Sequence, residues 1–86
     1  MGAETGVVVF IYPIKIGGVE RKQLPWIKGK TLLLYFKELG LQARRLNCHI
    51  VSKRLPKDTP PLRTSYVPWE NETIHLIPTG AGVRVV

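Results

Sequence analysis

The chain has 86 residues, of which 44% are hydrophobic and 22% charged, and it carries a formal net charge of +7. This length supports one domain, residues 1–86, with a single small core and no room for a large cleft. The composition is too apolar for a disordered protein, and the longest apolar run, residues 7–14, is far shorter than the roughly 20 residues that span a bilayer. Its one cysteine, Cys48, excludes an internal disulfide. We therefore expect a cytoplasmic globular domain that does not enter a membrane.

The basic residues are concentrated in the middle of the chain. Residues 15–63 hold twelve of the thirteen Lys and Arg side chains against three acids, whereas the two ends together hold one Arg and three acids. A positive field of this kind attracts polyanions and acidic protein surfaces without specifying either. The charge leaves open a nucleic-acid interface, an acidic protein partner and an ordinary solvated surface.

The first predicted element is a β-hairpin. Residues 7–12 form a β-branched and aromatic run that is apolar on both faces, which predicts a central strand. Gly17 and Gly18 favour a turn, and residues 19–24 return as a polar partner strand. Because Pro13 has no N–H to donate, we expect it at a bulge, at the end of the ladder or on an open side of the first strand.

A short helix is predicted over residues 31–40. Thr31 suits the N-cap position, and Gly40 suits the left-handed residue that ends a helix. The apolar side chains recur at helical spacing and predict one buried face. This face consists of Leu32, Leu33, Tyr35, Phe36 and Leu39.

Two more strands and a long loop follow the helix. Residues 46–52 alternate as a half-buried strand. Its inward side is expected to carry Leu46, Cys48 and Ile50. Residues 53–68 hold four of the seven prolines and predict a loop along the edge of the domain. After a turn at residues 70–72, a final strand is predicted over residues 73–77.

This order of elements resembles the β-grasp (ubiquitin-like) fold, an α+β fold in which one helix packs across a mixed four-stranded sheet. The end of the chain, residues 72–78 followed by Gly80-Ala81-Gly82, is similar to two groups of β-grasp proteins. One group is the sulfur carriers of the molybdopterin synthase small subunit type. The other is the ubiquitin-like domain of phage tail assembly proteins of the lambda protein I type.

The two resemblances imply different functions. The sulfur carriers act through a C-terminal Gly-Gly, whereas here Ala81 precedes Gly82 and four further residues, 83–86, follow. A carrier function would therefore require processing at Gly82. Residues 80–82 otherwise suit a turn before a short extended segment. The phage-type resemblance implies a non-catalytic component of a tail or virion, located in a bacterial host cytoplasm or in the virion itself.

The sequence predicts no active site, cofactor or metal site. Gly29-Lys30-Thr31 precedes a helix, but the glycine that a phosphate loop requires five positions before Gly29 is missing. Cys48 and His49 are adjacent, so on a strand they point to opposite faces and cannot act together as nucleophile and base. With His75 they lack the spacing typical of metal ligands. We expect a protein that binds and does not catalyse.

Two tryptophans are candidates for contact with a protein partner. Leu24-Pro25-Trp26 and Val67-Pro68-Trp69 repeat an apolar-Pro-Trp step, and Trp is enriched among interface anchors. We expect contacts from an exposed sheet edge, from residues 53–68 and from four side chains. These are Trp26, Arg63, Tyr66 and Trp69. The alternative, in which both indoles only cover the ends of a small core, stays open.

A nucleic-acid-binding surface is the second candidate. Trp26 lies beside Lys28 and Lys30, an arrangement that suits a base stacked on the indole with phosphates nearby. The basic residues expected to contribute are Arg21, Lys22, Lys28, Lys30, Arg44 and Arg45. No aromatic pair alternates along a basic strand as in the common RNA-binding sheets, so the sequence shows charge without a device for reading bases. The partner is left open among other virion or tail proteins, nucleic acid and a second copy of the chain.

Overall fold

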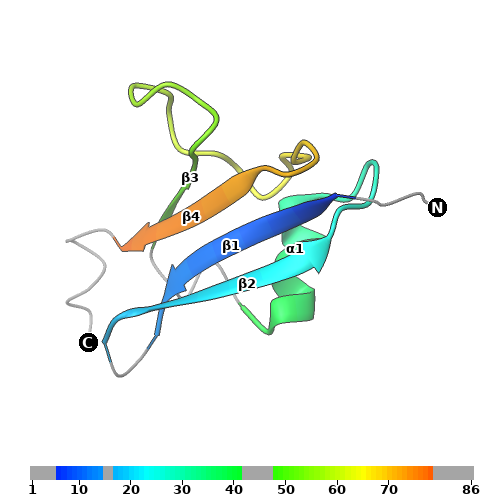
Figure 1. The fold of residues 1–86 in the computed structure, drawn as a ribbon. Coiled ribbons are helices and arrows are strands. Elements are labelled where there is room, and N and C mark those ends of the chain that lie inside the picture. The colour runs from blue at the N-terminus through cyan, green and yellow to red at the C-terminus, as the bar shows by residue number, and fades with distance from the viewer. Residues whose placement is uncertain (1–5, 15–16, 42–47, 79–86) are drawn as a thin grey trace.

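A computed structural model describes residues 6–14, 17–41 and 48–78, and the structural statements below concern these residues. They form one sheet and one helix (Figure 1). The elements are β1 (Val7–Pro13), β2 (Val19–Pro25), α1 (Leu32–Leu39), β3 (Cys48–Ser52) and β4 (Thr73–Pro78). The α+β class and the predicted order of elements are confirmed. The predictions for Arg44, Arg45 and Leu46 and for residues 79–86, which include Gly82, lie outside the described residues.

The four strands form a mixed sheet in the order β2-β1-β4-β3. β1 pairs antiparallel with β2 and parallel with β4, and β4 pairs antiparallel with β3. β1 therefore lies in the interior of the sheet, as its apolar residues on both faces predicted. Pro13 is the last residue of β1, where its missing N–H interrupts no interior hydrogen bond of the ladder.

The core lies between α1 and the sheet face that α1 covers (Figure 1). Phe10 in β1 contacts two aromatic rings of the helix, with ring centroids 5.5 Å from Tyr35 and 5.8 Å from Phe36. The remaining buried residues surround these rings. They are Val8, Tyr12, Leu32, Ile50, Ile74 and Leu76. On β3, Cys48 and Ile50 lie on the core side, as the alternation of that strand predicted.

The helix ends as predicted but begins differently. Gly40 follows the last turn with φ 75°, a conformation in which a side chain is strained. Thr31 occupies the N-cap position, but its side chain makes no capping hydrogen bond. The prediction that Leu33 belongs to the buried face is wrong: it is 45% exposed, because the helix meets the sheet along the narrower stripe of Leu32, Tyr35 and Phe36. Within the described residues, no helix has the length and apolar character needed to cross a membrane.

The long connection from β3 to β4 is tied to the domain at several points. The Lys53 N–H donates to the Thr73 carbonyl (3.1 Å), and the Leu62 N–H donates to the Ile50 carbonyl of β3 (2.7 Å). Farther along, carbonyls of the loop accept from the first turn of α1, with Tyr66 bonded to the Leu32 N–H at 2.9 Å. The N–H of Leu33 bonds the Thr64 carbonyl in the same way at 3.0 Å. The loop thus caps the helix in place of the Thr31 side chain.

Candidate functional site

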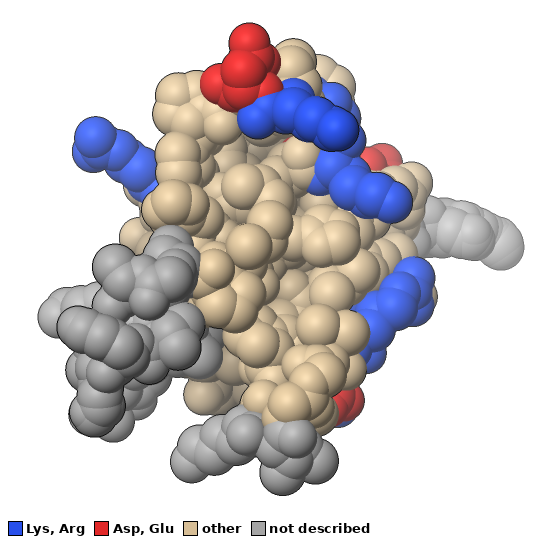
Figure 2. Space-filling view, turned by 90° about the vertical axis from the view of Figure 1, so that its left-hand side faces the viewer, with Lys and Arg blue, Asp and Glu red and all other residues tan. Residues whose placement is uncertain are grey.

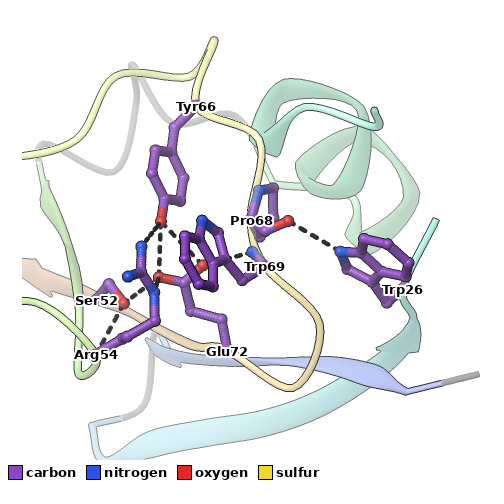
Figure 3. Close-up of polar contacts among 7 residues, drawn as sticks. All are labelled: Trp26, Ser52, Arg54, Tyr66, Pro68, Trp69 and Glu72. Atoms are coloured by element: carbon purple, nitrogen blue, oxygen red, sulfur yellow. Dashed lines mark hydrogen bonds and ion pairs between the residues drawn. The ribbon is translucent and has the colours of Figure 1, made fainter. Parts of the chain in front are cut away.

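A buried carboxylate lies at the base of the candidate site. Glu72 immediately precedes β4, and its side chain is 0% exposed. Its oxygens accept hydrogen bonds from the Tyr66 hydroxyl at 2.8 Å and from the Trp69 N–H at 2.7 Å (Figure 3). The Ser52 hydroxyl and the Arg54 Nε, the latter at 3.1 Å, complete the set of donors. A charge is stable in the interior only when it is paired and hydrogen-bonded in this way.

The donors keep Glu72 ionised. Burial alone would raise the pKa of the Glu72 carboxyl, but hydrogen bonds from Ser52, from the Trp69 N–H and from Tyr66, together with the Arg54 charge, outweigh burial. The pKa of Glu72 therefore lies below its ordinary value. The pKa of the Tyr66 hydroxyl is raised, chiefly by burial. The network thus holds a neutral phenol between an anion and a cation.

Trp69 lies at the surface above this network. It is 61% exposed, and the Arg54 guanidinium stacks on its indole with Cζ 4.0 Å from the ring centroid (Figure 3). Arg54 is itself held at two points, because its Nε bonds Glu72 and its Nη2 donates to the Tyr66 hydroxyl at 2.8 Å. We call Arg54, Tyr66 and Trp69, with Glu72 beneath them, the Trp69 cluster. It presents an aromatic ring and a cation in a fixed arrangement.

The two predicted tryptophans have different roles. Trp26 is half-buried against the core, and its Nε1 donates to the Pro68 carbonyl at 2.9 Å (Figure 3). It therefore covers one end of the core and fastens the segment that leads to Trp69. The alternative in which an indole only covers one end of the core therefore applies to Trp26. Trp69, in contrast, extends into solvent.

Of the four residues predicted to contact a protein partner, the structure brings Tyr66 and Trp69 together. Arg63 is exposed, and within the described residues its side chain has no ion pair with the cluster. Sequence reasoning missed Ser52, Arg54 and Glu72. Their positions in the sequence do not predict that they meet, because Glu72 lies 20 residues from Ser52 and 18 from Arg54. The one available signal is an acid directly before a strand, which the sequence alone predicts as part of a turn.

The predicted nucleic-acid residues that the structure describes do not gather at one place on the surface. Arg21 and Lys22 are exposed on β2, where Lys22 lies 3.6 Å from Glu20, and Lys28 is exposed in the turn before α1. The Lys30 side chain is only 12% exposed and contacts Glu38. Its Nζ also lies 4.6 Å from the centre of the Tyr35 ring. Lys30 is therefore engaged within the protein and does not extend toward a base stacked on Trp26.

Cysteine and histidine residues form no chemical cluster. Cys48 is half-buried toward the core, which raises the pKa of its thiol, and His49 is exposed on the opposite face of β3. Burial and the charge of Lys53 lower the pKa of His75 on β4. In the described ranges, no group of three His, Cys, Asp or Glu side chains is placed to hold a metal ion.

Comparison of the chain with protein-family models, with curated proteins and with solved structures found no match. The function is therefore inferred from the sequence and the geometry of the chain itself.

Proposed function

We propose that the protein is a β-grasp domain that acts as a non-catalytic protein-binding module, serving as a phage tail assembly protein or another virion-associated component. The strand order β2-β1-β4-β3, with a parallel pair formed by the first and last strands, supports the β-grasp assignment. The helix packed across one sheet face supports it as well. The virion assignment rests on the resemblance of the chain's end to the phage-type domains.

The exposed Trp69 is the observation that carries the binding function. The few residues that supply most of the energy at protein interfaces are enriched in Trp, Tyr and Arg, and all three types meet in the Trp69 cluster. An indole that is 61% exposed is unusual unless something covers it, since large apolar surface favours burial. The stacked Arg54 and the bonded Trp69 N–H hold this residue in place before binding. A partner therefore loses little affinity to the ordering of side chains.

Substitution of Trp69 tests the proposal. A tagged chain is used to capture its partner from the native source, and the affinity of the purified pair is then measured by calorimetry. We expect Trp69→Ala to weaken binding by about ten-fold or more, the effect of an interface hot spot. The fold should survive, because the Trp69 bond to Glu72 comes from the backbone. Leu34→Ala is the matched control, since Leu34 is 46% exposed on α1. Equal affinities for the two variants would exclude Trp69 as the anchor.

Two alternatives from the sequence have separate tests. Nucleic-acid binding is favoured by the charge of +7 and by exposed Arg21, Lys22 and Lys28. Binding of a fluorescent mixed-sequence oligonucleotide should then weaken by orders of magnitude as salt rises, and no binding at low salt removes this alternative. A sulfur-carrier function predicts a species ending at Gly82 in an intact-mass measurement of protein from its native source.

A further inference from the structure

A preformed groove lies between β3 and the first part of the long loop. Its volume is about 410 Å³. Its lining is mainly apolar, and the apolar residues in it are Val51, Leu55, Pro56, Pro60, Leu62 and Ile77. Ser52 also lines the groove, and its hydroxyl bonds Glu72. The groove therefore begins where the Trp69 cluster ends, on the same stretch of β3.

The loop that forms the groove is held in shape without a ligand. It is pinned to the sheet at both ends, by the Lys53 N–H on Thr73 and by the Leu62 N–H on Ile50. Between these points the Thr59 N–H bonds the Pro56 carbonyl at 3.0 Å and closes a turn. Prolines in this segment restrict the backbone further. The groove is thus ready to receive a ligand at a small entropic cost.

The two charged side chains that line the groove are both basic. Lys53 and Lys57 line it, both are exposed, and neither has an ion pair with an acid in the part of the chain that the structure describes. Figure 2 views the molecule from the side on which β4 ends, and most of the described surface there is uncharged, with Lys and Arg and fewer acidic side chains at its margins. The ligand that complements this pattern is apolar in the middle and negatively charged at its flanks.

We propose that the groove binds an extended segment of a partner protein, with about two apolar side chains flanked by Asp or Glu. A cavity of about 150 Å³ accepts one benzene-sized group, so the groove accommodates two such side chains and part of the backbone. A second copy of this chain fits less well, because its charge of +7 opposes the two lysines. The inference rests on the proposed binding function and names the chemistry of the partner at a position separate from Trp69.

Selection from a phage-displayed library of random peptides tests this inference on the full chain. We expect the enriched peptides to share two apolar residues next to Asp or Glu. Their affinity is then measured for two groove variants. Ile77→Thr removes an apolar wall and keeps a β-branched residue on β4, and we expect a loss of about five-fold to ten-fold. The double variant Lys53→Glu, Lys57→Glu reverses the charge at the groove, and we expect a loss of about five-fold or more.

Each variant has a matched control. Val19→Thr changes a β-branched residue that is 67% exposed on β2. Lys28→Glu, Lys37→Glu changes the net charge by the same amount at exposed positions outside the groove. Both controls should bind the peptides as the original chain does. Enriched peptides without acids, equal loss in variants and controls, or no enrichment at all would overturn the inference.

Other occupants produce distinct outcomes, each of which contradicts the inference. If octanoate shifts the NMR signals of Val51 and Leu62 and no peptide does, the groove binds a small apolar acid. If the chain sediments as a dimer that Ile77→Thr dissociates, the occupant is a second copy. Peptides that lose affinity only in Trp69→Ala would support the proposed function and reject the groove as the peptide site. Loss only in the groove variants would support the groove as the peptide site and would leave the role of Trp69 to the test of the proposed function.

Discussion

The two outer strands of the sheet contrast in how their free edges are handled. The outer edge of β3 is covered, because Leu62 and Leu55 of the long loop donate to the carbonyls of Ile50 and Ser52 at 2.7 and 3.2 Å. The outer edge of β2 is open: within the described ranges, no backbone group outside the β1–β2 ladder bonds to it. The ladder register directs the N–H and C=O groups of Val19, Arg21 and Gln23 outward.

The contrast shows how an edge can be protected in two ways with different consequences. At β2, the exposed Arg21 and Lys22, followed by Pro25, oppose pairing with another strand. This protection needs only side chains. At β3, protection by a loop requires anchors, which include the backbone bonds of the loop to the sheet and the contacts of Glu72 with Arg54 and Tyr66. The same loop contains one wall of the groove and leads to Trp69, so the covered edge lies beside both candidate binding surfaces.

The largest expected effect is a difference in stability between two variants, one that changes the acid beside β3 and one that changes the acid on β2. Glu72→Gln removes a buried charge and leaves Arg54 without its ion-pair partner, and we expect a loss of about 3 kcal/mol in the free energy of unfolding. Glu20→Gln breaks an exposed pair with Lys22 on β2 and should change it by less than about 0.5 kcal/mol. Urea denaturation measures both. Similar losses for the two variants would mean that the covered edge does not depend on its buried anchor.

A smaller effect of the same kind is expected from acid. The pKa of folded Glu72 lies below its ordinary value, so its contribution to stability is present in full above about pH 4.3 and is lost as pH falls through the folded pKa. The original chain should therefore lose stability below about pH 4.3 more steeply than Glu72→Gln, whereas Glu20→Gln should retain the slope of the original chain. Thermal denaturation across this pH range measures the slopes. Parallel curves for all three proteins would contradict the role of Glu72.

The smallest expected effect concerns the open edge. Arg21→Thr, Lys22→Thr removes its charges and raises its β-propensity, so we expect weak, concentration-dependent self-association with little change in stability. Lys28→Thr, Arg63→Thr lowers the net charge equally at exposed positions away from β2 and serves as the control. Sedimentation velocity distinguishes the two. If both variants remain monomeric at high concentration, the edge charges are not what keeps β2 unpaired.

Local patterns in the sequence predicted the elements, whereas the site depends on contacts between distant segments. Each of these patterns lies within or next to a single element: the apolar run of β1, the glycine after α1 and the alternation of β3. Glu72 acts as a buried anchor only because Ser52, Arg54 and Tyr66 fold around it. These residues do not recur at a regular spacing in the sequence that would predict their contact. For the same reason Trp26 and Trp69 looked alike. Their roles differ because only Trp26 faces the core and finds the Pro68 carbonyl.

Because the long loop caps α1, the opening of the first turn of α1 is coupled to the release of the loop that leads to Trp69. The amide hydrogens of Leu32 and Leu33 are bonded to carbonyls of Tyr66 and Thr64, so they can exchange with solvent deuterium only when the loop lifts from the helix. Release of the loop also frees the backbone that leads to Trp69. The exchange rates of these two amides therefore report how often the binding surface comes apart, from a position that no partner at Trp69 needs to touch.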